Sequence, residues 1–508
     1  MLSTIYLIAT TLLFKILGFL REILVAQFYG TGPITDAYVI ANSIPTVLIQ
    51  ALGTALAATF IPVFAQVEKD AGKKRAERFT CNLVVLVFIL CLALVVLGEM
   101  FSGQLVRLFA PGFVGETLAL TDEFVRILLP CLIFMSVMNI LGAYLQYHQQ
   151  FRVIGIVPAV GNLVIIISLF MAHYIGNPAF FVWGTLFGIC SQVLFYVYSI
   201  RINKLWHISL NPVFIMLKDK YVISLLPLLL PVFLGSAVNE INTIVGKSLA
   251  SSFDSGSVAA LDYAGKLIMM ISSVILGGLT AVFFPSLSKT AISKDIREFS
   301  ALSMKLNSVV VLVLLPIMAE TIYFSREIVS LIFKRGAFAG EAVELTASIL
   351  IFFALGLVGM GVREILTKMF YAMQDTKTPM KNGVVCALLN IFLSVLLVQY
   401  MGVCGLGLAT SLAAIFAAIN LWRKAVGLGW LAYNGQEFGK VILATVIMIL
   451  GQNFLSISAD SSIFSLILTL LHAVCIGGFL YAISLYGLKH SIALSLVEKL
   501  KRKWGDMV

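Results

Sequence analysis

The sequence KILGFLREILVAQFYGTGPITDAYVIANSIP (15–45) decides the fold. It overlaps an apolar segment, residues 2–28, that is long enough to cross a bilayer, which takes about 20 residues. Lys15, Arg21 and Glu22 nevertheless fall inside that segment. Ionisable side chains at membrane depth are costly and normally face a water-filled interior rather than lipid. The stretch therefore predicts a first membrane helix that lines a polar cavity with basic groups.

The composition of the whole chain is that of a helical membrane protein. Of the 508 residues, 60% are hydrophobic and 12% are charged, and the mean hydropathy is +1.02, whereas soluble domains are about 25% charged. The apolar runs are continuous rather than alternating, which argues against a membrane β-barrel. We expect an all-α integral membrane protein with about fourteen transmembrane helices. No small-residue cleavage site follows the first run, so we expect it to remain as a helix.

The basic residues mark one side of the membrane. Of the 35 Lys and Arg residues, 25 lie in alternate turns and in the tail, in the ranges 68–78, 149–152, 201–220, 289–305, 368–381, 423–440 and 489–503. Cytoplasmic loops carry such an excess of Lys and Arg, so we expect both termini to be cytoplasmic. The net charge of +10 is thus a topology signal rather than evidence for nucleic-acid binding.

An internal repeat divides the chain. REILVAQFYGTGPITDAY (21–38) aligns without gaps on GKSLASSFDSGSVAALDY (246–263), a shift of 225 residues, and QQFR (149–152) falls on QDTK (374–377) at the same shift. Because that shift covers an even number of helices, the two halves form a parallel repeat, an arrangement typical of transporters. The predicted organisation is a first lobe of six helices (1–200), a cytoplasmic linker (201–220), a second lobe of six helices (221–424), two further helices (425–488) and a basic cytoplasmic tail (489–508).

Equivalent helices of the two lobes carry polar side chains at membrane depth. The candidate solute-binding residues are Lys15, Arg21, Asp36 and Lys266, and a second set that we expect to line the same cavity is Glu22, Asn242, Lys247 and Asp262. Arg21–Glu22 and Asp262–Lys266 could simply pair to hold helices together, and the spacing suits the second pair. The excess of cations instead favours an anionic solute, of which phosphate is the natural candidate because Arg and Lys both bind it. Both interpretations stay open for any single residue.

Other ionisable residues in the spans are less informative. Glu320 follows a proline in the ninth span, and in the tenth we expect Arg363, Glu364 and Lys368 to pair for structural reasons. The last two spans are mostly apolar, and His472 is a group within them that can carry a charge. They are either packing helices that face lipid or the walls of a groove for a long hydrocarbon chain, and composition does not separate these two roles.

Motifs of soluble catalysis do not occur in the sequence. We find no P-loop, GxSxG, HExxH or Rossmann fingerprint in context. The seven cysteines lie in or beside apolar spans without a CxxC pair, and the five histidines are scattered, so no metal site is expected. We therefore expect neither an enzyme nor a cofactor. Without an ATP site, transport would be driven by an ion gradient or by the membrane potential, which is worth about 2.3 kcal/mol per charge per 100 mV.

Several motifs resemble one family of transporters. They are LGFLRE (17–22), TDAYVIANSIP (35–45), FIPVF (60–64), APGF (110–113), SGSVAALDYAGKL (255–267), FPSLSK (284–289), FKRGAF (333–338) and FYAMQDTKTPMK (370–381). Together they are similar to the MurJ (MviN) family, the lipid II flippases of bacterial peptidoglycan synthesis in the MOP superfamily. The resemblance implies two lobes around a cationic cavity and a groove between the last two helices for the undecaprenyl tail. The family's cavity cations fall by motif on Lys15, Arg21 and Lys266, and its acid of the second helix falls on Asp36.

The resemblance also implies a partner and a place. The substrate would be lipid II, moved from the inner to the outer leaflet of the bacterial cytoplasmic membrane by alternating access, with the cell-wall synthesis machinery as a further partner. One alternative is a flippase for another undecaprenyl-diphosphate-linked oligosaccharide, of the exopolysaccharide or O-antigen type. A MATE-like antiporter would need deep acidic groups, and a scaffold for cell-wall enzymes would not need the cavity charges at all.

Overall fold

The computed structural model describes residues 2–205, 219–292, 295–432, 435–454, 463–495 and 498, with the backbone alone for 2–15 and for 226, 231, 234, 281, 454 and 463. These residues form helices and turns without a β-strand. In chain order the helices are α1 (Leu2–Tyr29), α2 (Pro33–Ala71), α3 (Lys73–Met100), α4 (Ser102–Phe109), α5 (Gly115–Leu128), α6 (Cys131–Tyr147), α7 (Phe151–Ile175), α8 (Ala179–Ile202), α9 (Lys220–Ala250), α10 (Ser257–Ile292), α11 (Ile296–Tyr323), α12 (Ser325–Phe333), α13 (Gly340–Ala354), α14 (Leu357–Ala372), α15 (Lys377–Met401), α16 (Val403–Gly427), α17 (Gly435–Phe454), α18 (Ile463–His472), the π-helical turn η1 (Ala473–Gly477) and α19 (Gly478–Gly487).

The lengths of these helices match the thickness of a bilayer. In the described part of the chain, nine helices are long and apolar enough to cross a membrane, and twelve spans result when each of three bent pairs counts as one. The bent pairs include α5 with α6, at 42°, and α13 with α14, at 45°. Helices α1 and α17, with 28 and 20 residues, are also long enough to span. The predicted all-α membrane fold with about fourteen spans is confirmed.

The internal repeat is visible in the order of the helices. In the first half a short helix, α4, is followed by the bent pair α5–α6, and in the second half the short helix α12 is followed by the bent pair α13–α14. Helices α4 and α12 begin at Ser102 and Ser325. The turns that follow them place Phe113 and Phe338 at equivalent positions, and both side chains are buried. The two halves therefore repeat one structural plan, as the sequence predicts.

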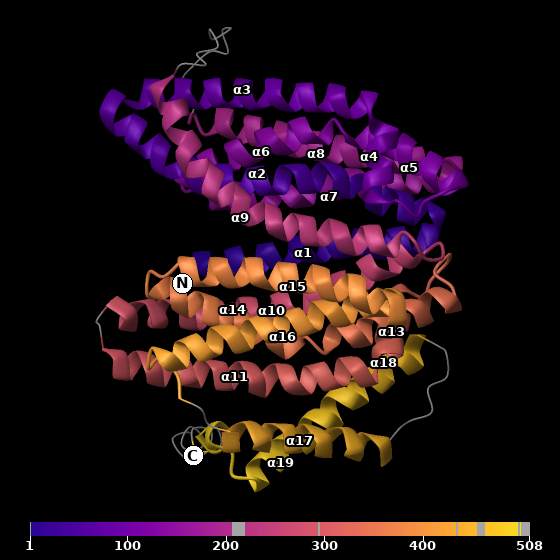
Figure 1. The fold of residues 1–508 in the computed structure, drawn as a ribbon, viewed down its shortest axis with the longest axis vertical. Helices are drawn as coiled ribbons and strands as arrows, with labels where there is room; N and C mark the ends of the chain where they lie inside the picture. Colours follow the sequence, from indigo (N-terminus) through magenta and orange to yellow (C-terminus); the bar gives the residue numbers. More distant parts are fainter. Residues whose placement is uncertain are drawn as a thin grey trace. The chain divides into compact units, whose positions relative to one another are not determined.

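The chain packs as two compact units. One comprises Met1–Ala259 with Arg335–Phe338, and the other comprises Ala260–Lys334 with Ala339–Val508. In the first unit the long helix α2 packs against α3, α5, α6 and α9, and Figure 1 shows α2, α6 and α8 running alongside one another. Buried aromatic rings hold this packing, because Phe60 stacks on Phe79 at 6.0 Å and Phe64 meets Tyr144 edge-on at 5.5 Å.

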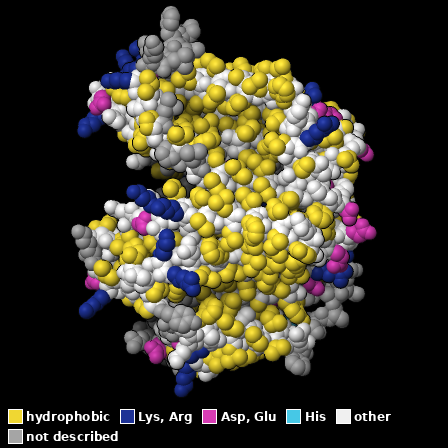
Figure 2. Space-filling view, in the orientation of Figure 1, with side chains coloured by type: hydrophobic (Ala, Val, Ile, Leu, Met, Phe, Trp, Pro, Cys, Tyr) yellow, Lys and Arg dark blue, Asp and Glu magenta, His cyan; other side chains and the backbone are white. Residues whose placement is uncertain are grey.

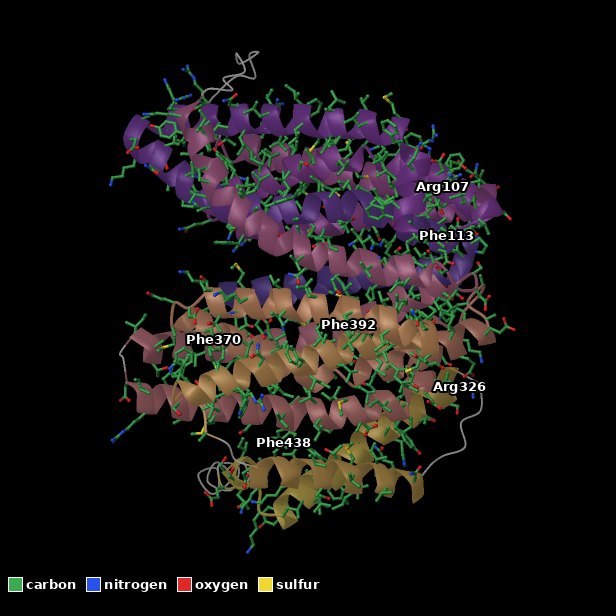
Figure 3. The ribbon with its side chains drawn as sticks, in the orientation of Figure 1. Arg107, Phe113, Arg326, Phe370, Phe392 and Phe438 are labelled. Carbon is green, nitrogen blue, oxygen red and sulfur yellow. The ribbon has the colours of Figure 1, made fainter. Side chains whose placement is uncertain are left out.

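The second unit has its own core between α10, α11, α14 and α16. Phe370 of α14, labelled in Figure 3, is fully buried and packs against Trp430, with ring centroids 5.0 Å apart. Trp430 follows α16 and also meets Phe299 of α11 edge-on at 5.7 Å. Helix α17 packs against α11 and α19 on the other side of α11 (Figure 1). Within the second unit, α17 therefore packs against α11, and α18 packs against α12.

The surface of the helices is apolar. Large side chains such as Leu163, Ile167, Phe392 and Leu443 are exposed, and Figure 2 shows hydrophobic side chains covering the sides of the helices. Lys and Arg side chains lie at the ends of the helices, with more of them on the left than on the right in Figure 2. Exposed apolar sides with charged ends are what a bilayer requires of a helical bundle.

Candidate functional site

Arg21 and Glu22 form an ion pair on α1. The Arg21 guanidinium donates to the Glu22 carboxylate, and its Nη1 also donates to the side-chain oxygen of Asn162 on α7 at 3.2 Å. Glu22 is buried, whereas 27% of the Arg21 side chain remains exposed. A Cβ atom at Gly18 would lie 3.2 Å from the Asn162 amide, so the glycine lets α7 approach α1 closely here. The cation is therefore held in place by two groups and still has an accessible surface.

The carboxylate of Asp36 closes the amino end of α10. One oxygen accepts from the backbone N–H of Gly256 at 2.6 Å, and the other accepts from the N–H of Ala259 at 2.8 Å. The first N–H groups of a helix have no partner within it, and a negative charge is favourable beside them. Only 1% of Asp36 is exposed. Asp36 thus satisfies backbone donors that lie 220 and 223 residues away in the sequence.

Turns from four parts of the chain meet around this cap. The N–H of Ala337 donates to the carbonyl of Gln27 at 2.8 Å, and the N–H of Gly112 donates to Ser251 Oγ at 3.2 Å. These contacts are close: a Cβ atom at Gly112 would lie 2.3 Å from the Ser251 carbonyl oxygen. At Gly256 a Cβ would lie 3.2 Å from Thr31, and the backbone there has φ +94°, which favours glycine. Asp36 therefore lies in a tightly packed end of the first unit.

Lys247 and Asn242, both on α9, have different surroundings. The Lys247 ammonium donates to Ser43 Oγ on α2 at 2.9 Å, and the Ser43 hydroxyl in turn donates to the carbonyl of Val39. Asn242 is half-buried. Of these two predicted cavity residues, Lys247 joins α9 to α2, and the partner residue Ser43 was not among the predicted ones.

Asp262 and Lys266 form an ion pair on α10, in the second unit. The Lys266 Nζ lies 2.6 Å from Asp262 Oδ2, one helical turn away, and 6.0 Å from the ring centroid of Tyr263. The Lys266 side chain is 35% exposed and that of Asp262 is 13% exposed. As on α1, a partly exposed cation is paired with a more deeply buried acid.

These contacts change the balance of charge that the sequence suggested. The candidate residues with described side chains are three cations, Arg21, Lys247 and Lys266, and three acids, Glu22, Asp36 and Asp262. The side chain of Lys15 lies outside the described residues. The two hydrogen bonds of the Asp36 carboxylate described above are to backbone N–H groups of α10 and its cap, rather than to a cationic side chain. Glu22 and Asp262 each form an ion pair with a candidate cation, Arg21 and Lys266 respectively.

The partners of these residues carried weak sequence signals. Asn162 is one of a few polar residues in an apolar span, and Ser43 is one of many small hydroxyl residues. The N–H groups of Gly256 and Ala259 leave no signal in a sequence, since every residue except proline has one. The ion pair that we expected between Glu364 and Lys368 does form, at 3.4 Å.

A further ion pair lies at the start of α9. Arg75 Nη2, near the start of α3, is 2.9 Å from Asp219 Oδ2, and the Asp219 side chain is fully buried. Asp219 Oδ1 also accepts from the N–H of Tyr221, which caps α9. Within the residues that the structure describes, no group of three or more His, Cys, Asp and Glu side chains is placed to hold a metal ion.

A repeated bundle of apolar spanning helices, with paired charges inside the spans, defines a polytopic membrane transporter. Comparison with known proteins gives the family. The model of the family "Lipid II flippase MurJ" matches residues 25–469, most of the chain. The chain therefore belongs to the MurJ lipid II flippase family.

Individual relatives and structures agree with the family. The chain is 27% identical over 507 residues to the "Probable lipid II flippase MurJ" of Buchnera aphidicola subsp. Baizongia pistaciae, a match that covers 96% of this chain and 97% of that protein. A solved "Lipid II flippase MurJ, inward closed conformation" has a TM-score of 0.83 at 24% identity and covers 95% of this chain and 99% of that one. An inward-facing multidrug resistance MATE family transporter of the MOP superfamily has a TM-score of 0.68 at 17% identity, covering 82% and 95%. The two structures establish the shared fold.

Proposed function

We propose that this chain moves lipid II from the inner to the outer leaflet of the bacterial cytoplasmic membrane by alternating access. The observation that carries the proposal is the family match over residues 25–469. The repeated helical plan supports it, because transporters built from two parallel repeats bind their solute where the repeats face each other. The chain would act without covalent chemistry and without a cofactor, driven by the membrane potential or by an ion gradient.

The groups proposed to hold the diphosphate are Lys15, Arg21 and Lys266. Arg21 and Lys266 keep 27% and 35% of their side chains exposed, so a phosphate oxygen can reach them. In the empty protein Glu22 and Asp262 act as their counter-ions, which lowers the cost of keeping a cation inside a membrane protein. A diphosphate would compete with these carboxylates, and its charge would replace theirs.

The proposed organisation follows the sequence repeat. The two lobes are residues 1–200 and 221–424, joined by the linker 201–220, and the helices within 425–488 form the groove for the undecaprenyl chain. The bias of Lys and Arg towards alternate turns and the tail supports cytoplasmic termini. The cell-wall synthesis machinery is a proposed further partner.

The test is carried out in bacteria that depend on this chain for growth. Wild type is expected to restore the appearance of lipid II on the outer leaflet, and Arg21→Ala is expected to abolish it while the protein stays in the membrane. Arg126→Ala is the matched control, since Arg126 is also paired with an acid, Asp122 at 3.1 Å, but is more than half exposed. Normal translocation by Arg21→Ala would overturn the role of Arg21.

The same strain distinguishes lipid II transport from the alternative functions. In cells with the wild-type chain, one alternative outcome is that another undecaprenyl-diphosphate-linked oligosaccharide reaches the outer leaflet while lipid II stays on the inner leaflet. That result would assign the chain to an exopolysaccharide or O-antigen pathway. Growth restored equally by wild type and by Arg21→Ala, without any translocated lipid, would instead indicate a scaffold. A MATE-like antiporter would lower the cellular content of cationic drugs, which is measured in the same cells.

A further inference from the structure

A polar cluster in the second unit contains none of the residues proposed to bind the headgroup. It joins α11, α17 and the π-helical turn η1. The side-chain nitrogen of Gln452, Nε2, donates to Glu320 Oε1 at 2.6 Å and to the carbonyl of Ala473 at 2.9 Å. Glu320 lies on the spanning helix α11, and Ala473 is the first residue of η1. One amide group therefore connects an acid on one helix with an irregular turn in another.

The three elements approach very closely at this point. A Cβ atom at Gly477 would lie 2.0 Å from Gln452 Nε2 and 2.6 Å from Glu320 Oε1, so no larger residue fits there without displacing both groups. Gln452 is 3% exposed. Single π-helical turns inside α-helices occur frequently at functional sites. The close packing, the glycine and the π turn together indicate a built site rather than an incidental contact.

The hydrogen bonds of the cluster are incomplete. Gln452 Oε1 is a buried polar atom without a hydrogen-bond partner among the described residues. A buried polar atom left without a partner destabilises the folded state, because it loses its hydrogen bonds to water and gains none in return. The Gln452 amide cannot be turned to correct this, since the atom that faces the Ala473 carbonyl must be the nitrogen donor. The site therefore needs a donor for Gln452 Oε1.

Glu320 can supply that donor only as a neutral acid. An ionised carboxylate has acceptor oxygens alone, whereas a protonated one has an O–H donor. Carboxylic acids and primary amides pair through two hydrogen bonds, N–H to the acid carbonyl and O–H to the amide carbonyl, and the first of these is present. In the described part of the chain Glu320 makes no ion pair, and Gln452 is its hydrogen-bond partner. A charge here would be costly in a spanning helix.

Other titratable groups on these elements or on adjoining ones include Tyr323, Tyr481 and His472. Tyr323, one turn along α11, donates to Asn453 on α17, and Tyr481 of α19 donates to the Leu312 carbonyl at 2.7 Å. His472, the last residue of α18, precedes η1 directly.

We propose that Glu320 is a proton-binding site, which holds its proton while α17 and η1 pack against α11 and can release it when they separate. The ligand is a proton, and the acceptor that recognises the protonated state is Gln452 Oε1. The site is distinct from the proposed headgroup residues, so proton binding can be measured whether or not the chain transports lipid II.

The experiment is infrared spectroscopy of the purified full-length protein in lipid. At neutral pH we expect a carboxylic-acid carbonyl band that is absent from Glu320→Gln and unchanged in Glu341→Gln. Glu341, near the start of α13, is the matched control because it is an exposed acid of the same unit. Raising the pH should remove the band from the wild-type spectrum. Identical neutral-pH spectra for wild type and Glu320→Gln would overturn the proposal.

A second variant tests the hydrogen bond and does not depend on the folding of Glu320→Gln. Gln452→Leu removes the amide, so the acid band should move to the frequency of a carboxylic acid without a hydrogen bond, or should vanish if the acid loses its proton. An acid band unaltered by Gln452→Leu would show that Gln452 does not recognise the protonated state, and would overturn that part of the proposal. Thermal unfolding of each variant verifies that the protein is folded.

Discussion

Replacing Asp36 tests how strongly one carboxylate holds the turns of the first unit together. Its two hydrogen bonds are to backbone N–H groups, at 2.6 and 2.8 Å, and Asp36 is almost completely buried. Hydrogen bonds to a charged group contribute about 1.5–3 kcal/mol each. Asp36→Asn keeps one acceptor oxygen and should lose about 1.5–3 kcal/mol. Asp36→Ala keeps neither and should lose about 3–6 kcal/mol, since both contacts disappear.

The loss should appear as opening of the adjacent turn. Thr31 packs against Gly256, whose N–H is one of the two donors. A cysteine placed there by Thr31→Cys should react slowly with a maleimide in the otherwise unchanged purified protein. Its labelling is followed in the peptide that contains it, because the native Cys475 is also exposed. Since about 1.4 kcal/mol corresponds to a factor of ten in an equilibrium, adding Asp36→Asn should raise the labelling rate roughly 10- to 100-fold.

The control for this experiment lies in the same turn. Asp254 is exposed, so Asp254→Asn removes an equal charge without removing a buried hydrogen bond. It should leave the labelling rate of the introduced cysteine within about a factor of two, because surface substitutions usually change stability by less than about 0.5 kcal/mol. An equal labelling rate in the parent and in a folded Asp36→Asn variant would refute the role assigned to this carboxylate.

Two further predictions concern the ends of α9 and α15. Arg75→Ala should destabilise the purified protein by about 1–3 kcal/mol, which is less than for a fully buried pair because the Arg75 side chain is 31% exposed. Adding Asp219→Asn should recover most of this loss, as measured by thermal unfolding. A double variant as unstable as Arg75→Ala would contradict the ion-pair argument. Asp375 accepts from the N–H of Thr378 at 2.9 Å, and this hydrogen bond holds the pKa of Asp375 below its usual range. Because the pKa of Asp375 is lower in the folded protein than in the unfolded chain, where it is about 3.9, the ionised carboxylate stabilises the fold at pH values above this unfolded pKa. This stabilisation is lost as the pH falls through the pKa of the folded protein. The thermal stability of wild type should therefore fall towards that of Asp375→Asn in this acidic range, whereas parallel pH curves would rule the contribution out.

The fold could be predicted because a membrane leaves few solutions. Each span needs about 20 apolar residues, and backbone groups in lipid must be paired within a helix. The repeat was visible in the gapless match of residues 21–38 with 246–263, whereas the equivalent buried positions of Phe113 and Phe338 emerged only from the structure. The bend between α5 and α6 was not predicted, since a bend inside one apolar run leaves its length and hydropathy almost unchanged.

The candidate site was predictable in part. Arg21 with Glu22 and Asp262 with Lys266 are near in sequence, so their pairing could be foreseen as one of two interpretations, and both contacts form. The hydrogen bonds of Asp36 could not be foreseen, because its partners are backbone atoms of a distant segment. The arrangement of Glu320 with Gln452 and η1 depends on a π-helical turn, for which the sequence has no simple signal.

The cap of α10 also sets an order of events during biosynthesis. Asp36 and the N–H of Gly256 are 220 residues apart, and ribosomes add about 5–20 residues per second. After α2 has been made, its carboxylate therefore waits roughly 10 to 45 s for its partner to be synthesised. During that interval the nascent α2 keeps an acid in its first turn without these two backbone donors, and synthesis of the second repeat supplies them.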